Sequence, residues 1–180
     1  MRADAAPGEL ELVRAFVNTF DVEEGLDELE SPRALAEWLC AQGLLPGGRA
    51  TRADLTNARR CREAIRALLL ANNGVSVRKE AAVTLSRTAA RARLELRFDI
   101  DGAVHVEPAA SGVDAALGRI LALISAAMVA GTWSRLKACR AEDCRWAFYD
   151  HARNKSRHWC SMAVCGNRTK ARAYRRRHAA

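Results

Sequence analysis

The chain has 180 residues, a formal net charge of +8 and 49% hydrophobic residues. The positive charge is unevenly placed: residues 133–180 contain thirteen Lys or Arg against three Asp or Glu, which leaves the rest of the chain with a net charge of −2. No run reaches the roughly eighteen apolar residues of a membrane-spanning helix, and residues 1–8 hold no apolar run typical of a secretory leader, so we expect a cytoplasmic protein outside membranes.

Three amphipathic helices are expected in the first half of the chain. Apolar side chains recur at spacings of three and four in residues 9–20, 32–43 and 51–71. Ser31 before Pro32 is a suitable start for the second helix, and either Thr51 or Asp54 can begin the third. The acidic stretch 21–30 is expected to form a loop.

A hairpin and a long helix follow. Apolar and charged residues alternate over 94–98 and again over 104–106, with an Asp-Gly turn between them, which predicts two antiparallel strands. From 113 to 137 the apolar residues return to helical spacing. Gly131 interrupts or weakens that helix and is a candidate hinge.

The expected fold is therefore of the α+β class. Residues 1–130 form a mainly helical N-terminal domain with a small antiparallel hairpin, and residues 131–180 form a small C-terminal unit. The long helix is expected to be the physical link between the two.

Four cysteines dominate the C-terminal unit. Cys139 and Cys144 form one C-x4-C pair, Cys160 and Cys165 form a second, and fifteen residues separate the pairs. Zinc takes four tetrahedral ligands and binds thiolates strongly, so two short loops can close round one ion. Disulfides are not expected in a reducing cytoplasm, and the spacings match neither common ferredoxin run. We therefore expect one structural Zn²⁺.

The same ligand set argues against catalysis. Four cysteine ligands leave zinc no open position for a reactive water. The sequence also lacks a glycine-rich phosphate loop, a nucleophile elbow and a carboxylate–histidine motif at catalytic spacing. We expect a protein that is not an enzyme.

A strongly basic helix is expected directly after the last cysteine. Its cationic residues are Arg168, Lys170, Arg172, Arg175, Arg176 and Arg177. Positions 168, 172, 175 and 176 share one side by three- and four-residue spacing, and an arginine fork can contact phosphate oxygens or a guanine edge. Clustered positive charge of this kind favours binding to nucleic acid, although a solvated charged face is the simpler explanation.

The stretch between the cysteine pairs contains both polar and aromatic residues. Arg153, Lys155 and Arg157 are further candidates for phosphate contact, as are His151 and His158, which are less favoured as zinc ligands. Four aromatic residues in this unit are expected to form its miniature core rather than stacking platforms: Trp146, Phe148, Tyr149 and Trp159.

The N-terminal domain offers weaker signals. A small-molecule pocket is one interpretation of several polar or amphipathic residues near the helical core, with ordinary capping, pairing or packing as the alternative. The candidate lining residues are Asn18, Thr19, Asp21, Trp38, Arg59 and Arg62.

Residues 131–177 resemble the CGNR zinc finger, whose motif corresponds here to Cys165, Gly166, Asn167 and Arg168. The upstream segments FVNTFD, SPRALAEWL and REAIRALLLANNG, with the Asp-Gly hairpin, resemble the ABATE domain that accompanies this finger in bacterial proteins classed as stress-induced transcription regulators. The resemblance implies one zinc ion on Cys139, Cys144, Cys160 and Cys165 and a DNA-binding role for the finger.

A knuckle, a hairpin and a helix carrying the last ligand at its start would form a treble-clef-like finger. In that arrangement Gly166 would let the chain turn sharply, and Asn167 would cap the helix. The favoured hypothesis is a zinc-dependent DNA-binding transcription regulator, whose N-terminal domain senses a small molecule or forms a homodimer. The alternatives are an RNA- or ribosome-associated binding module and an adaptor for an acidic protein.

Overall fold

The computed structural model describes residues 5–178, so residues 1–4 and 179–180, at the ends of the two predicted domains, lie outside the described part. The helices are α1 (Leu10–Asn18), α2 (Pro32–Ala41), α3 (Arg52–Ala71), α4 (Lys79–Ala92), α5 (Gly112–Val129) and α6 (Asn167–His178). The strands form the antiparallel pairs β1 (Phe20–Asp21) with β2 (Leu26–Asp27), β3 (Leu94–Phe98) with β4 (Val104–Pro108), and β5 (Leu136–Ala138) with β6 (Ala147–Tyr149). This confirms the predicted mainly helical fold with small antiparallel sheets.

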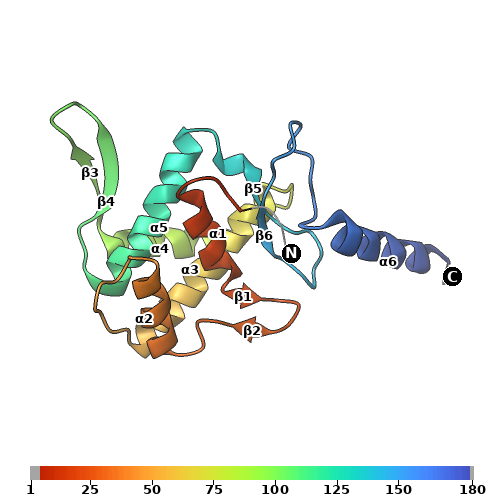
Figure 1. The fold of residues 1–180 in the computed structure, drawn as a ribbon, viewed down its shortest axis with the longest axis horizontal. Coiled ribbons are helices and arrows are strands. Elements are labelled where there is room, and N and C mark those ends of the chain that lie inside the picture. The colour runs from red at the N-terminus through yellow and green to blue at the C-terminus, as the bar shows by residue number, and fades with distance from the viewer. Residues whose placement is uncertain (1–4, 179–180) are drawn as a thin grey trace.

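Helix α3 is the centre of the helical part, with α1, α2, α4 and α5 packed against it (Figure 1). Its start is fixed by a capping box, in which the Thr51 hydroxyl accepts from the Asp54 backbone N–H and the Asp54 carboxylate accepts from the Thr51 N–H. The Ser31 hydroxyl caps α2 in the same way by accepting from Ala34. Both starts agree with the sequence prediction.

The expected helix over 113–137 is wrong at its C-terminal end. Helix α5 stops at Val129 because the Gly131 N–H donates to Met128 and the Thr132 N–H donates to Ala127, with Gly131 at a φ of +69°. This is the glycine-dependent C-cap in which a left-handed residue closes the last turn. The chain then makes a short 3₁₀ turn and enters strand β5.

Helix α5 is long and apolar enough to span a membrane by length and composition, with a mean hydropathy of 1.7 over 18 residues. In the structure, however, its apolar face packs against α1, α3 and α4. Leu117 and Ile120 are fully buried there. These contacts are those of a core helix in a globular protein.

The hydrophobic core does not end at residue 130. Leu136, Ala138, Ala147 and Tyr149, from the β5–β6 hairpin, belong to the same buried cluster as the side chains of α1, α3 and α5. The expectation that one helix links the two parts is therefore wrong, since α1 and α3 also contact the hairpin directly.

Two hairpins lie outside this core. The acidic stretch expected as a loop forms the short β1–β2 pair, with Glu23 and Glu24 at its turn. The predicted hairpin at β3–β4 is confirmed and extends away from the helices, on the opposite side of the molecule from α6 (Figure 1).

Candidate metal centre and nucleic-acid interface

The four cysteines come from three segments, because Cys139 and Cys144 share the connection between β5 and β6. Cys139 follows β5 directly, Cys144 lies in the turn that leads to β6, Cys160 lies in the loop after β6, and Cys165 lies in the short π-helix that precedes α6. The first turn is closed by hydrogen bonds of 2.9 Å from the Cys139 N–H to the Trp146 carbonyl and 3.0 Å from the Cys144 N–H to the Ala141 carbonyl.

The sulfur geometry fits one zinc ion. All four Sγ atoms lie within 4.8 Å of one another, and the Sγ atoms of Cys160 are 3.6 Å from Cys144 and 3.7 Å from Cys165. A tetrahedron with Zn–S bonds of about 2.3 Å has edges of about 3.8 Å, whereas a disulfide bond is about 2.05 Å long. The four cysteines can therefore bind one zinc ion without forming disulfides.

The protonation states of the four thiols depend on one another. Hydrogen bonds from Cys144 and Cys160 lower the pKa of the Cys139 thiol to about 4. The pKa of Cys160 is raised because Cys139 and Cys144 compete for the same protons. Without a cation the cluster favours one thiolate rather than four, and a divalent metal would stabilise the remaining negative charges.

The aromatic residues of the unit divide between two cores. Trp146 and Trp159 are partly buried and pack against the cysteine cluster. Tyr149 instead joins the main core with the helices, and the Phe148 ring is buried under the guanidinium of Arg157, 5.1 Å from the ring centroid. The predicted separate core of the finger therefore holds only part of these aromatic residues, because Tyr149 belongs to the main core.

The predicted roles of Gly166 and Asn167 are wrong. Ser161 caps the π-helix by accepting from the Val164 N–H, while the Asn167 side chain donates to the Ala163 carbonyl. Gly166 has no positive φ, so it makes no sharp turn. A Cβ there would lie 2.5 Å from the Met162 sulfur, a contact that the exposed Met162 side chain can relieve by moving.

The C-terminus of α3 holds the metal-binding loops in place. The Asn73 amide donates to the carbonyls of Ala138 and His158, both at 2.8 Å, and its oxygen is 2.8 Å from Nδ1 of His158. Asn72 donates to the carbonyls of Trp133 and Leu136. The sequence predicted only that these asparagines end a helix. It did not predict their hydrogen bonds to the segments around Trp133, Ala138 and His158.

A second amide joins α1 to the finger. Asn18 Nδ2 donates to the Ala147 carbonyl at 2.9 Å, and Asn18 Oδ1 accepts from the Ala147 N–H at 2.8 Å. This pairing satisfies both backbone groups of a buried β6 residue and leaves the side chain committed to structure.

A buried ion pair shapes the loop between the cysteine pairs. Lys137 Nζ lies 2.8 Å from Asp150 Oδ2, and both side chains are almost completely buried. The same ammonium donates to the carbonyls of Lys155 and Arg157, and Asp150 accepts from two backbone N–H groups. Nothing in the sequence marked this pair, because either residue alone resembles an ordinary surface charge.

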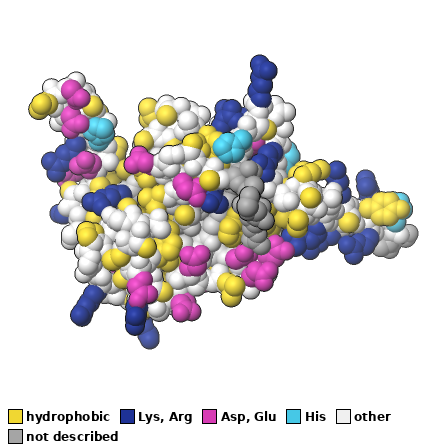
Figure 2. Space-filling model, in the orientation of Figure 1, with side chains coloured by type: hydrophobic (Ala, Val, Ile, Leu, Met, Phe, Trp, Pro, Cys, Tyr) yellow, Lys and Arg dark blue, Asp and Glu magenta, His cyan; other side chains and the backbone are white. Residues whose placement is uncertain are grey.

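Helix α6 presents the predicted basic residues to solvent. It has no buried residue and extends from the body of the protein (Figure 1). Figure 2 shows Lys and Arg side chains along it and a group of acidic side chains near its base. Positive charge is therefore concentrated along α6.

The basic residues of α6 fall into two groups. Arg168 lies 2.7 Å from Glu23 on the β1–β2 turn and 3.4 Å from Asp143, and Arg172 lies 2.8 Å from Asp143. The Glu23 carboxylate raises the pKa of Arg168, and Arg172 lowers that of Asp143. The other group makes no ion pair among residues 5–178 and consists of Lys170, Arg175, Arg176 and Arg177.

The residues between the cysteine pairs that were predicted to contact phosphate also fall into two groups. Arg153 and Lys155 are exposed. Arg157 faces inward and donates to the Cys160 carbonyl at 2.9 Å, next to a metal-binding sulfur. The two histidines are likewise engaged in the structure, since His151 contacts the Ala5 carbonyl and His158 contacts Asn73.

The residues considered for a small-molecule pocket form internal contacts. Arg62 donates to Thr19 at 3.1 Å and forms an ion pair of 2.6 Å with Asp27, and Trp38 packs on Phe16. Asp21 accepts from the backbone of the β1–β2 turn, and Asn18 binds β6 as described above. These side chains are used in holding elements together.

Comparison with known families gives two matches. Residues 10–132 match the ABATE family, described as "putative stress-induced transcription regulator", and residues 135–178 match the CGNR zinc finger family. No curated protein matches the chain significantly. The two matches confirm the family resemblance drawn from the sequence.

Proposed function

The chain belongs to the ABATE family and carries a CGNR zinc finger, and from that premise we propose that it is a zinc-dependent, DNA-binding transcription regulator of the cytoplasm. In this proposal Zn²⁺ on Cys139, Cys144, Cys160 and Cys165 is structural, and the protein catalyses no reaction. The predicted domains, 1–130 and 131–180, then act as one regulatory part and one nucleic-acid-binding part.

The observation that carries the proposal is the exposure of α6. Lys170, Arg175, Arg176 and Arg177 have no carboxylate partner within the described chain, so their charge is available to phosphates. Binding of such residues to a duplex releases counterions and supplies affinity that falls steeply with salt. We assign Arg153 and Lys155 to the same surface, and we give Arg168 and Arg172 the additional role of orienting the helix.

Zinc acts through position in this proposal. Cys165 lies in the turn of helix immediately before α6, and Arg168 Nη2 is 3.6 Å from its sulfur. An ion that joins Cys165 to the other three cysteines therefore fixes the start of α6 against the β5–β6 hairpin. Removal of the metal would free the basic helix from its anchor.

Titration of a labelled DNA duplex with the zinc-loaded full chain, followed by fluorescence anisotropy at several salt concentrations, tests the proposal. Replacement of Arg175, Arg176 and Arg177 by Ala is expected to reduce affinity and lower the salt slope by roughly one per residue. A matched triple replacement of Arg33, Arg97 and Arg119, which removes the same charge elsewhere, is expected to have little effect. Equal losses of DNA affinity in the two variants would show that the effect depends on net charge and not on the position of the arginines.

Parallel titrations decide between the remaining partners. Tighter binding to structured RNA than to duplex DNA at matched salt would favour the RNA-associated alternative. Binding to neither nucleic acid at low salt would favour an acidic protein partner. A homodimer formed through the helical part would double the number of contacts with DNA, and sedimentation of the free protein measures it directly.

A further inference from the structure

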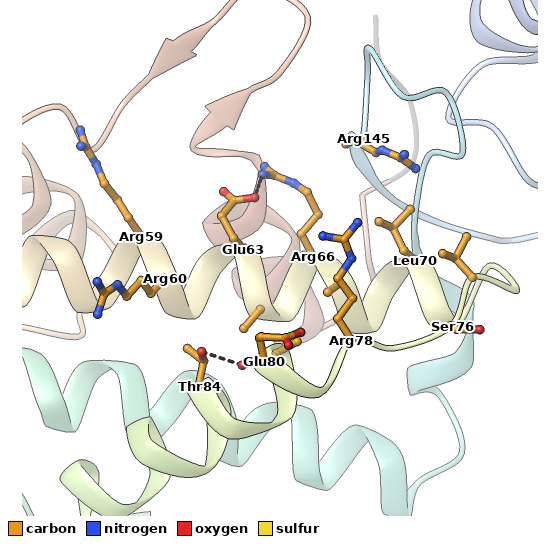
Figure 3. Close-up of a pocket in the computed structure, with 14 residues that line it drawn as sticks. Arg59, Arg60, Glu63, Arg66, Leu70, Ser76, Arg78, Glu80, Thr84 and Arg145 are labelled. Carbon is orange, nitrogen blue, oxygen red and sulfur yellow. Dashed lines mark hydrogen bonds and ion pairs between the residues drawn. The ribbon is translucent and has the colours of Figure 1, made fainter.

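A hollow of about 640 Å³ lies between α3 and α4, outside both the metal centre and α6 (Figure 3). Its walls come from the exposed face of α3, the segment that connects α3 to α4, and the start of α4. A fourth wall comes from the finger, because Arg145 reaches the hollow from the turn between Cys144 and Trp146. The volume lies within the range of about 300–1,000 Å³ that small-molecule sites occupy.

The floor of this hollow is apolar. Ala64, Ala67 and Leu70 of α3 line it together with Val75 and Ala81 from the opposite wall. Such a surface favours an occupant with an aliphatic or aromatic body, because burying that body removes apolar area from water. A bare phosphate backbone would gain little from it.

The rim is cationic. Five arginines line the hollow against two glutamates, and two of the five are already engaged: Arg59 with Asp27 and the Leu29 carbonyl, and Arg66 with Glu63. The side chains of Arg60 and Arg78 make no hydrogen bond or ion pair within residues 5–178, and Arg145 makes only a 3.4 Å contact with a carbonyl. Unused positive charge thus remains above an apolar floor.

One buried hydrogen-bond donor near the hollow has no partner. The Nε of Arg66 is buried and has no hydrogen-bond partner in the described structure, although its other nitrogens bind Glu63 and the carbonyls of Val17 and Phe20. Figure 3 shows the Arg66 guanidinium beside Glu63, whereas those of Arg78 and Arg145 lie farther along α3, toward Leu70. A buried donor without a protein partner can be satisfied by a bound water or by a ligand atom.

We propose that this hollow binds a small organic anion, with one carboxylate or phosphate group held by Arg78 and Arg145 and an apolar body on Ala67, Leu70 and Val75. Of the residues that the sequence suggested for a small-molecule pocket, only Arg59 lines this hollow. Its occupant would touch both the α3–α4 region and the turn that carries Cys144, and would therefore favour one position of the finger relative to the helices.

A direct test uses 1-naphthoate as the probe and its neutral analogue 1-naphthamide, titrated into the zinc-loaded full chain by calorimetry. Naphthoate is expected to bind about tenfold or more tightly than naphthamide, because only the anion pairs with the rim arginines. Inorganic phosphate, which lacks the apolar body, is expected to bind more weakly than naphthoate. In NMR spectra, naphthoate is expected to shift the backbone amides of Arg145 and Trp146.

Variants assign the site. Arg78→Gln and Arg145→Gln are each expected to weaken naphthoate binding several-fold, and Ala67→Phe is expected to fill the hollow and abolish it. Arg119→Gln, exposed on α5, is the matched control and is expected to leave binding unchanged. Thermal melting of each variant shows whether it is folded.

Equal affinity for naphthoate and naphthamide, or unchanged affinity in both arginine variants, would overturn the proposal. Displacement of naphthoate by duplex DNA at equal zinc loading would also overturn it, since the hollow would then belong to the nucleic-acid surface. The titrations with naphthoate and naphthamide contain no DNA, so their outcome does not depend on whether α6 binds DNA.

Discussion

Replacement of Asn73 by Ala is expected to loosen the finger from the helices without touching a cysteine. Asn73 is 2% exposed and makes three side-chain contacts of 2.8 Å, to Ala138 and His158. Ala138 precedes Cys139, and His158 lies two residues before Cys160. The Asn73 side chain therefore holds the backbone beside one cysteine of each pair.

The size of the effect follows from these contacts. A typical intramolecular hydrogen bond contributes about 1 kcal/mol net, and a buried group left without a partner costs about 1–3 kcal/mol. Because three contacts are lost together and water can re-enter part of the gap, we expect the free energy of unfolding to fall by about 2–4 kcal/mol. That is a large share of the roughly 5–15 kcal/mol typical of a domain.

Urea unfolding of the zinc-loaded chain measures this loss, and competition with a chelator measures zinc affinity. Both are expected to fall in Asn73→Ala, because folding of the loops and metal binding are linked. Asn57→Ala, within α3 and with no side-chain hydrogen bond in the described structure, is the control and is expected to change stability by less than about 0.5 kcal/mol. A loss below about 0.5 kcal/mol in Asn73→Ala, or unchanged zinc affinity, would refute the reasoning.

Three further predictions concern the metal, the α6 anchor and pH. Cys165→Ser is expected to abolish tight zinc binding and release α6, measured by metal content and by amide exchange in α6, whereas protection of α6 in the metal-free variant would contradict it. Glu23→Gln is expected to raise duplex affinity a few-fold, because it removes the closer of the two carboxylates that pair with Arg168 and leaves only Asp143. Glu24→Gln, with the same charge change, is not expected to raise it, and equal gains in the two variants would show that only net charge matters. Burial alone would raise the pKa of Asp27, but hydrogen bonds from Arg62 lower it in the folded protein. The ionised Asp27 carboxylate therefore stabilises the fold above the unfolded pKa of about 3.9, and this stabilisation is lost as pH falls through the lower folded pKa. The stability gap between the wild type and Asp27→Asn, about 2–3 kcal/mol at pH 6, should therefore narrow below about pH 4 in paired denaturation curves, and a constant gap would contradict this sign.

Local signals in the sequence predicted much of the fold. Ser31 with Pro32 and Thr51 with Asp54 marked helix starts because a cap depends on residues close in the chain. The paired cysteine spacing indicated the metal centre for the same reason. Where a structure depends on neighbours a few residues apart, the pattern is sufficient.

Features set by distant contacts could not be predicted in this way. Trp133 and Leu136 continue a helical spacing after α5, and only the cap at Gly131 and the shared core turn that segment into a strand. Asn73 carries no sign of its partners 65 and 85 residues away. Arg168 was assigned to a nucleic-acid face by its place on the helix, but its partner Glu23 lies 145 residues earlier.

X-ray absorption at the zinc edge of the purified full chain tests the central claim, that one ion on four cysteines anchors the basic helix. It is expected to show one zinc per chain with four sulfur neighbours at about 2.3 Å. A shell containing nitrogen from His151 or His158, or a folded chain without zinc, would contradict the account.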